Sequence, residues 1–366
     1  MKKIIKVLHV GEYVQGGVAT YVRTIINHNN PYINDYIVLS NYKSEHSWNL
    51  PRERIIYYDY HRSLFSIPKA IYNIKKAIEK INPDVIYCHS TWAGFFVRVP
   101  MLLKKPKCNV LYNAHGWAFL QNIAEWKRKI YASIEKILSF RTNQIINVSQ
   151  NEYDMAVKYG LDAGKLCVIY SGISADRKSG HYNVDLPKDK INILFVGRFD
   201  LQKGIDYLLD EFVKCNRNDL FLTVIGDNVI NKNDYKKKYK KKNIKFLGWV
   251  KHDEIADYYE AVDVVVMPSR WEAFGLVAIE AMKYATPVIV SNRGALREII
   301  AHGKTGYVFP FDKGALTKVL QMLSKEELLK LGKNAEKEFL KKYQESCMLK
   351  STVFLYEKYG NDTVGI

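Results

Sequence analysis

Short apolar runs alternate with amphipathic segments along the chain. In the first half, six runs of strand length stand at residues 7–10, 36–39, 85–88, 110–112, 144–148 and 167–170. Between two of them, residues 67–81 place Ala70, Ile74 and Ile81 on one face of a helix. After a polar stretch at residues 174–190, the alternation restarts with six further runs at residues 191–196, 220–225, 245–247, 264–267, 287–290 and 307–309.

Strands that alternate with helices predict parallel sheets covered by helices on both faces. Because the alternation restarts once, we expect an α/β protein with two Rossmann-like doubly wound domains facing a central cleft, which holds the ligand at the carboxyl ends of the strands. The first domain is predicted to span residues 1–180 and the second residues 181–342. A length of 366 residues agrees with two domains.

Composition and charge narrow the class of partner. Hydrophobic residues make up 48% and charged residues 25%, which is typical of globular proteins and excludes disordered and collagen-like chains. The 55 Lys and Arg exceed the 38 Asp and Glu by 17 charges, so we expect an anionic partner: nucleic acid, an anionic membrane surface or a phosphorylated small molecule. The five cysteines contain no CxxC pair, which favours reduced thiols over zinc binding.

Neither a signal peptide nor a membrane span is predicted. The N-terminal stretch has two lysines before an apolar run, but Lys6 and His9 interrupt that run and no small-residue cleavage site follows. No segment reaches the roughly 18 uncharged apolar residues of a transmembrane helix. The expectation is therefore a cytoplasmic protein, soluble or at most peripheral to a membrane.

A glycine turn follows the first predicted strand. Gly11 and Gly16 have the first spacing of a nucleotide-binding P-loop, but Gly17 and Val18 stand where its Lys and Ser/Thr would be. The GxGxxG spacing of nicotinamide-binding folds is absent too. What remains is a helix start at which Gly16 and Gly17 let backbone N–H groups approach a phosphate, with a plain tight turn as the alternative.

Two cations follow the first strand of the second half. Gly197 ends that strand, and Arg198 and Lys203 stand five residues apart before the next helix. A planar bidentate donor and a point charge at such a position suit a diphosphate. The alternative is two surface charges on a loop.

Two glutamates lie further along, in a strand–loop–helix–strand segment. Glu272 is predicted in the loop and Glu280 on the helix, seven residues apart. If the helix begins around Gly275, its free N–H groups face the same pocket as the two cations. A carboxylate accepts from two vicinal hydroxyls at once, so Glu280 suits a ribose and Glu272 a hexose. A hydrolase carboxylate pair and two solvated glutamates are the alternatives.

With these residues, the chain resembles the retaining nucleotide-sugar glycosyltransferases of family 4, which have the GT-B fold. The resemblance covers nearly the whole chain. It rests on Gly16-Gly17, Asn113 to Trp117, Gly197-Arg198, Lys203-Gly204, Gly226-Asp227, Phe246 to Gly248, Pro268-Ser269 through Met282, Pro287-Val288, Gly294 and Thr305-Gly306. It implies that the C-terminal helix, at about residues 343–366, joins the first domain.

The resemblance also implies a role for each site residue. Arg198 and Lys203, with Gly16 and Gly17, would bind the donor diphosphate, and Glu280 would bind the ribose. The transferred sugar would be held by Glu272 and the backbone of Phe274, Gly275 and Leu276. Glu272 and His115, the latter beside the reacting carbon, would be the catalytic residues. Neither a metal nor a cofactor is expected.

Two positions depart from the family pattern. Residues 170–174 read Tyr-Ser-Gly-Ile-Ser, where such families usually have Asn-Gly-Val/Ile-Asp. Gln202 stands where Glu is common, outside the expected phosphate ligands. The first departure leaves the contacts of that turn open.

The implied function is transfer of a hexose or N-acetylhexosamine, with retention, from a nucleotide diphosphate sugar, with a UDP-sugar favoured. The acceptor would be a glycan or a polyprenyl-diphosphate-linked sugar in cell-surface polysaccharide synthesis (O-antigen, capsule, lipopolysaccharide or exopolysaccharide). The alternatives are another GT-B enzyme, such as a nucleotide-sugar epimerase or a glycogen-type synthase, and more remotely a basic nucleic-acid-binding protein. No nucleic-acid-binding signature is evident, so nucleic acid is not an expected partner.

The first half of the chain also suggests a membrane surface. Residues 1–185 hold 25 Lys and Arg against 14 Asp and Glu. Aromatic residues stand near this excess at Trp92, Phe95, Phe96, Trp117, Phe119 and Trp126. The neighbouring cations are Arg98, Lys104, Lys105, Lys107, Lys127, Arg128 and Lys129. A mixed basic and aromatic surface docks on anionic lipid, so we expect peripheral binding at the cytoplasmic face. The alternative places these aromatic residues in the core.

Overall fold

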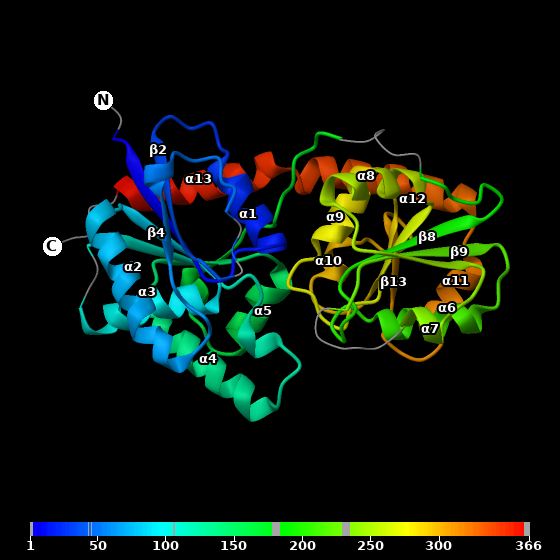
Figure 1. Cartoon of the computed structure of the whole chain (residues 1–366), viewed down its shortest axis with the longest axis horizontal. Coiled ribbons are helices and arrows are strands. Elements are labelled where there is room, and N and C mark those ends of the chain that lie inside the picture. Colours follow the sequence, from blue (N-terminus) through cyan, green and yellow to red (C-terminus); the bar gives the residue numbers. More distant parts are fainter. Residues whose placement is uncertain are drawn as a thin grey trace. The chain divides into compact units, whose positions relative to one another are not determined.

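The structure is a computed structural model that describes residues 3–42, 44, 46–104, 107–177, 184–228 and 235–361. The chain divides into two compact units (Figure 1). Unit 1 comprises the residues up to Gly172 together with those from Glu345 onward, and unit 2 runs from Ile173 to Gln344. The predicted boundary near residue 180 lies outside the described residues, which resume at 184.

Unit 1 is a parallel sheet with helices on its faces. Within its described residues, seven strands form the order β3-β2-β1-β4-β5-β6-β7. The strands are β1 (Ile5–Gly11), β2 (Ile33–Ser40), β3 (Ile55–Tyr58), β4 (Val85–His89), β5 (Asn109–Asn113), β6 (Gln144–Asn147) and β7 (Leu166–Val168). The helices are α1 (Gly17–Ile26), α2 (Ile67–Ile81), α3 (Thr91–Leu103), α4 (Glu125–Ser139), α5 (Gln150–Lys158) and α13 (Glu345–Asn361). Short 3-10 turns are η1 (Arg52–Arg54), η2 (Leu64–Ser66), η3 (Ala118–Leu120) and η4 (Ala163–Lys165).

Unit 2 has the same architecture, a parallel sheet with helices. Its described residues form a six-stranded parallel sheet of order β10-β9-β8-β11-β12-β13. The strands are β8 (Ile191–Val196), β9 (Leu220–Ile225), β10 (Ile244–Gly248), β11 (Val264–Met267), β12 (Val288–Ser291) and β13 (Gly306–Phe309). The helices are α6 (Ile205–Cys215), α7 (Tyr235–Lys238), α8 (His252–Ala261), α9 (Leu276–Lys283), α10 (Leu296–Ile299), α11 (Ala315–Met322) and α12 (Lys325–Lys342). The predicted pair of Rossmann-like sheets is confirmed.

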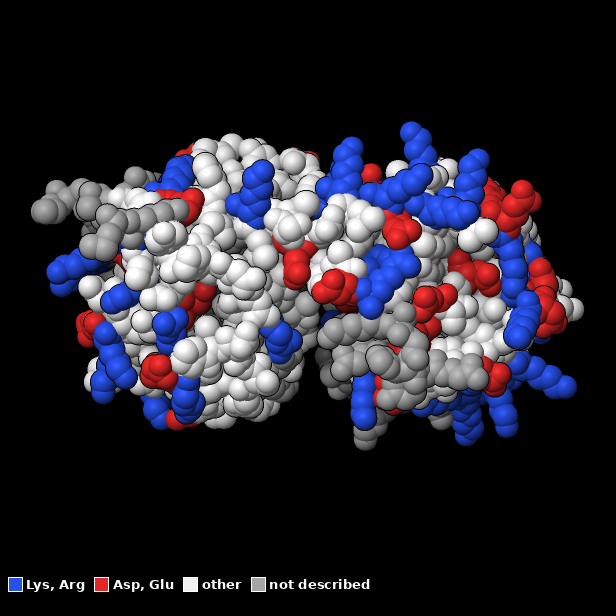
Figure 2. All heavy atoms as spheres, turned by 90° about the horizontal axis from the view of Figure 1, so that it is seen from above, with Lys and Arg blue, Asp and Glu red and all other residues white. Residues whose placement is uncertain are grey.

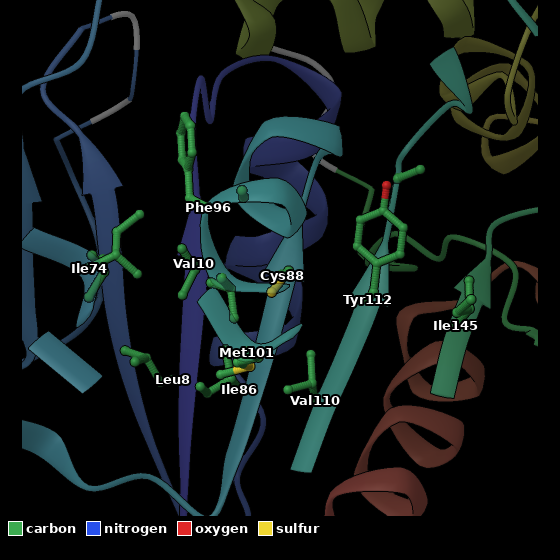
Figure 3. Packing of buried hydrophobic residues seen from close by; sticks show 14 of the residues in the cluster. Leu8, Val10, Ile74, Ile86, Cys88, Phe96, Met101, Val110, Tyr112 and Ile145 are labelled. Carbon is green, nitrogen blue, oxygen red and sulfur yellow. The ribbon is translucent and has the colours of Figure 1, made fainter. Parts of the chain in front are cut away.

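The core of unit 1 lies between one face of the sheet and its covering helices. Because alternate side chains of a strand point to opposite faces, Leu8 and Val10 of β1 share one face while His9 points to the other. Figure 3 shows the packed layer, with residues from the strands and from α2 and α3: Leu8, Val10, Ile74, Ile86, Cys88, Phe96, Met101, Val110, Tyr112 and Ile145. All ten are buried.

One strand was missed by the sequence analysis. β3 (Ile55–Tyr58) pairs with β2 at the edge of the sheet, and only its last residue is buried. An edge strand needs few fully buried side chains, so its pattern is weak. The strand that precedes His115 is therefore the fifth of unit 1, where the sequence suggested the fourth.

The predicted basic and aromatic surface needs correction. Phe96, Trp117 and Phe119 are buried in the core, and Trp92 and Phe95 pack against it. Arg98 is also fully buried, where it donates to Glu135 at 2.8 Å and its guanidinium lies 3.7 Å from the centre of the Tyr112 ring. These residues fill the interior because they stand on the inner side of α3 and in the turn after β5. Of the six aromatic residues, only Trp126 is exposed.

Charged side chains cover much of the surface of the protein. In the face drawn in Figure 2, Lys and Arg gather more densely over unit 2 than over unit 1 and are mixed with Asp and Glu. The six lysines at residues 236–242 are all exposed, as a solvated surface requires. Among the helices in the described part of the chain, none has the length and apolar character needed to span a bilayer.

Candidate active site

The glycine turn of unit 1 joins β1 to α1. Gly16 is the N-cap residue of α1 and has φ +57°, a left-handed conformation that favours glycine. Gly17 is the first residue of the helix. The first N–H groups of a helix lack intrahelical acceptors and attract anions, so this turn has the geometry for approaching a phosphate.

His115 stands just after β5 in unit 1. Its backbone has φ +51°, which is strained for a residue other than glycine, and its N–H donates to Asn113 Oδ1 at 2.8 Å. The imidazole Nε2 lies 3.1 Å from Nδ1 of His89. Burial lowers the pKa of the His115 imidazole to about 3, so the ring is neutral at physiological pH. A partly exposed, neutral histidine at a strand end is suited to accept or donate one hydrogen bond to a ligand.

The two predicted cations of unit 2 follow β8. Arg198 Nη2 lies 3.1 Å from Oε1 of Gln202 and 3.1 Å from Oδ2 of Asp200. The backbone N–H of Lys203 donates to Asp200 Oδ1 at 3.0 Å. Asp200 thus ties the two cationic residues into one turn. Gly204, in the left-handed conformation (φ +69°), is the N-cap residue of α6.

Lys203 and Glu272 form the central contact of the candidate site. Lys203 Nζ lies 2.6 Å from Glu272 Oε1, although the residues are 69 positions apart. Ser269 Oγ donates to the same carboxylate oxygen at 2.9 Å. Only 22% of the Lys203 side chain and 8% of the Glu272 side chain are exposed, so the pair is largely shielded from water. Shielding strengthens an ion pair but makes the loss of either partner costly.

The backbone around Glu272 is held by a glycine turn after β12. Gly294 has φ +59°, and a Cβ at this residue would lie 2.3 Å from the backbone oxygen of Glu272. The Ala295 N–H donates to that oxygen at 3.2 Å. Gln202 Nε2 donates to the neighbouring Trp271 oxygen at 3.2 Å. The position of Glu272 therefore depends on glycine at residue 294.

Helix α9 begins at Leu276, with Gly275 as its left-handed N-cap (φ +112°), so the start that the sequence predicted is correct. Phe274 is buried, and its ring centre lies 5.9 Å from that of Tyr343. Glu280 lies on the helix and accepts from the Tyr259 hydroxyl at 2.8 Å. Burial and the nearby Glu280 carboxylate raise the pKa of Tyr259 well above its usual range, so this hydroxyl remains a donor.

The structure thus brings Lys203 and Glu272 into direct contact. Arg198 and Glu280 belong to the same unit and each has other partners, whereas Gly16, Gly17 and His115 belong to unit 1. Sequence reasoning missed four supporting residues: Asp200, Tyr259, Ser269 and the role of Gln202 beside Arg198. Asp200, Gln202 and Ser269 lie within the motifs already singled out, but Tyr259 is 21 residues from Glu280 and carries no local signal.

Within the described ranges, no group of three or more His, Cys, Asp or Glu side chains is arranged to hold a metal ion.

Two family models match the chain and together span most of it. The model described as Glycosyltransferase Family 4 matches residues 15–177, and the model described as Glycosyl transferases group 1 matches residues 176–354. The junction of the two matches lies close to the division between the two units at Gly172 and Ile173.

Curated relatives agree with this assignment. A protein of Klebsiella pneumoniae, "Uncharacterized 41.2 kDa protein in cps region", is 35% identical over 96% of this chain and 99% of its own length. An uncharacterized glycosyltransferase of Methanocaldococcus jannaschii is 30% identical over 75% of each chain. An Escherichia coli protein named "UDP-Gal:alpha-D-GlcNAc-diphosphoundecaprenol alpha-1,3-galactosyltransferase" is 27% identical over 63% of each chain.

Solved structures share the fold over almost the full length. Sucrose-phosphate synthase from Thermosynechococcus elongatus has a TM-score of 0.81 at 22% identity, covering 97% of this chain and 98% of that one. Anabaena HepE, crystallised in complex with UDP and glucose, has a TM-score of 0.77 at 18% identity, covering 97% of this chain and all of that one. From its two Rossmann-like units, its family models and its relatives, this chain belongs to the family 4 glycosyltransferases of the GT-B fold.

Proposed function

We propose that the protein transfers a hexose or N-acetylhexosamine, with retention of configuration, from a UDP-sugar to a glycan or polyprenyl-diphosphate-linked acceptor in capsule or related polysaccharide synthesis. The observation that carries this proposal is the shielded Lys203–Glu272 pair, whose lysine shares its turn with Arg198. The choice of donor and acceptor is supported by the name of the E. coli relative, by the cps region of the Klebsiella relative and by the UDP in the HepE structure.

The donor diphosphate would bind at Arg198 and Lys203. In the structure each cation is paired with a carboxylate, Asp200 or Glu272, so the site is close to neutral before the donor binds. The diphosphate would replace Asp200 as the main partner of the exposed Arg198 and share Lys203 with Glu272. Because negative charge grows on the diphosphate as the sugar–phosphate bond breaks, two fixed cations stabilise the transition state.

The ribose and the sugar of the donor would be bound by carboxylates and backbone groups. Glu280, oriented by the Tyr259 hydroxyl, would accept from the two ribose hydroxyls. Glu272 and the N–H groups at the start of α9, from Phe274 to Leu276, would hold the sugar hydroxyls. His115 would face the reacting carbon and Gly17 the diphosphate.

Retention would follow if the acceptor attacks from the face that the leaving group vacates. The bond between the anomeric carbon and the phosphate oxygen breaks, the acceptor oxygen bonds to that carbon, and the acceptor proton passes to the leaving phosphate oxygen. The products are the extended acceptor and the nucleoside diphosphate. No metal takes part in this scheme, because the two cations supply the charge.

A donor screen tests the proposal. The full chain would be incubated with UDP-, GDP- and ADP-sugars and a polyprenyl-diphosphate-linked sugar, with and without EDTA, and the product analysed by mass spectrometry and proton NMR. We expect turnover with a UDP-sugar, an anomeric configuration equal to that of the donor, and no effect of EDTA. An inverted product would overturn retention, and isomerised nucleotide sugar without transfer would identify an epimerase.

Peripheral membrane binding is proposed for one helix of unit 1, α4 (Figure 1). Its outer face exposes Trp126, Ile130, Ile134 and Ile137 at 62%, 47%, 39% and 52%. Exposed lysines flank them at residues 127, 129 and 136. An apolar helix face bordered by lysines fits an anionic bilayer, where apolar side chains enter the headgroup boundary and lysines meet the lipid charge.

Vesicle sedimentation tests this docking. Wild-type protein should bind vesicles that contain anionic phospholipid, less so at high salt, and Trp126→Ser with Ile134→Ser should abolish most of the binding. Phe354→Ser is the matched control, because Phe354 is 64% exposed on α13 of the same unit. Equal binding by the double variant and the control would refute docking through α4.

A further inference from the structure

A continuous row of hydrogen-bonded side chains crosses the sheet of unit 1 and ends at His115. His9 of β1 and Asp35 of β2 lie on the sheet face opposite to Leu8 and Val10, and His89 ends β4. Asp35 Oδ1 lies 3.0 Å from His9 Nε2, His9 Nδ1 lies 2.9 Å from His89 Nε2, and His89 Nδ1 lies 3.1 Å from His115 Nε2. The three inner members are almost completely buried.

At the Asp35 end of the row, the direction of the hydrogen bonds is fixed. The backbone N–H of Asn30 donates to His28 Nδ1 at 3.1 Å, so that nitrogen is an acceptor and carries no proton. The proton of His28 is therefore on Nε2, which donates to Asp35 Oδ2 at 2.8 Å. Burial alone would raise the pKa of Asp35, but hydrogen bonds from His28 and His9 outweigh burial and lower it, so the carboxylate is ionised and only accepts.

The direction of each hydrogen bond then determines the direction of the next one along the row. Since Asp35 only accepts, Nε2 of His9 carries a proton; with a single proton on this ring, Nδ1 is unprotonated and accepts a hydrogen bond. His89 must donate to that Nδ1 from its own Nε2, and it then offers an unprotonated Nδ1 to His115. His115 in turn must donate from Nε2. Burial, with smaller effects of His9 and His115, lowers the pKa of His89 well below its usual range, so the middle ring stays neutral.

We propose that Asp35, His9 and His89 are positioning residues that act through His115: they hold its imidazole in the tautomer with the proton on Nε2, so that Nδ1 is a hydrogen-bond acceptor for the substrate. A sugar hydroxyl or the acceptor hydroxyl is the matching group, because it can donate to an unprotonated ring nitrogen. The catalytic consequence rests on the proposed function, whereas the tautomer does not.

The tyrosines that pack on the row are uncharged and therefore leave the tautomers of its histidines unchanged. Tyr21 of α1 packs edge-on against His115, Tyr87 of β4 packs on His89, and Tyr356 of α13 packs on His9. Burial raises the pKa of Tyr21 to about 12 and of the other two well above their usual range, so all three stay uncharged. The negative charge that faces His9 is that of Asp35.

The test is the tautomer of His115 in the full chain, read from ring ¹⁵N shifts after selective histidine labelling, with the signal assigned through His115→Gln. We expect wild-type His115 to carry its proton on Nε2 only. Asp35→Asn should lose this single tautomer. Tyr356→Phe is the matched control, because the Tyr356 ring packs edge-on against His9 while its hydroxyl is buried without a hydrogen-bond partner, and the tautomer should be unchanged.

Kinetics separate this inference from the proposed function. With an active donor and acceptor, Asp35→Asn should lower kcat by about 10- to 100-fold and leave the KM of the donor nearly unchanged, as for other second partners that orient a histidine. A wild-type His115 protonated on Nδ1, or an Asp35→Asn variant with the wild-type tautomer, would overturn the inference. The wild-type spectrum decides even if the variant does not fold. If the tautomers behave as expected but no sugar is transferred, the proposed function fails and the positioning role stands.

Discussion

The two units hold their candidate site residues in different ways. In unit 2, Arg198, Lys203 and Glu272 stand on the turns after β8 and β11, and their partners belong to these two turns. In unit 1 a single partly exposed imidazole, His115, is fixed by a buried row that starts at Asp35. Ion pairs on turns can exchange partners when an anion binds, whereas a buried row fixes the direction of one hydrogen bond. Under the proposed function, unit 2 would bind the nucleotide and unit 1 would orient the reacting group.

Loss of Lys203 is expected to have the largest effect. Lys203→Ala removes a cation from the diphosphate site and leaves the shielded Glu272 carboxylate without its ion-pair partner. We expect kcat/KM to fall by about 10²- to 10³-fold, as when one donor to a developing negative charge is removed. Lys214→Ala is the control, because that lysine pairs with Glu211 on α6, away from the two turns. Equal activity of both variants would remove Lys203 from the site.

A substitution in the glycine turn beside Glu272 is expected to lower activity less than Lys203→Ala does. The chain also offers a closely matched control for it. Gly294 and Gly303 have similar left-handed φ angles, +59° and +69°, but only at Gly294 would a Cβ meet the Glu272 backbone, since at Gly303 nothing lies within 4 Å. Gly303→Ala should lose about 1 kcal/mol of stability through backbone strain, and Gly294→Ala more, because its Cβ would also overlap the Glu272 backbone. Only Gly294→Ala should also lose activity, about tenfold or more, because it displaces Glu272.

Thermal unfolding and kcat/KM measured on both variants decide this point. Similar losses of activity in Gly294→Ala and Gly303→Ala would show that strain, and not displacement of Glu272, is responsible.

The smallest effect is expected at Tyr259. Tyr259→Phe removes the hydroxyl that donates to Glu280, which costs about 1 kcal/mol, or roughly fivefold in the KM of the donor. Tyr258→Phe on the same helix, α8, is the control. Initial rates at varied donor concentration measure the effect; a change in kcat alone would argue against a role of Glu280 in binding the donor.

The sequence predicted the arrangement of Lys203 and Glu272 in unit 2 better than the surroundings of His115 in unit 1. Lys203 and Glu272 are far apart in the chain, but each lies directly after a strand of one parallel sheet, and the carboxyl ends of such strands meet at one edge. The row that leads to His115 was missed because His9 lies inside a run interpreted as plain core, whereas Asp35 and His89 lie just outside the runs predicted as strands. A polar residue in an apolar run, such as His9 in Val-Leu-His-Val, was the available signal. The direction of its hydrogen bond depends on residues 26 and 80 positions away.

The surface was the least predictable part. Trp117 and Trp126 are nine residues apart, yet one is 1% exposed and the other 62%. The difference arises because Trp117 donates to Asn147 within the sheet, whereas Trp126 stands on the outer side of α4. Composition alone does not separate the two environments.

Calorimetric titration of UDP into the wild type, Lys203→Ala and Asp35→Asn tests the division of roles most directly. The wild type should bind UDP, Lys203→Ala should bind it at least about tenfold more weakly, because a charge-assisted contact is lost, and Asp35→Asn should bind it as the wild type does. Unchanged UDP affinity in Lys203→Ala, or loss of UDP binding in Asp35→Asn, would contradict the assignment of nucleotide binding to unit 2.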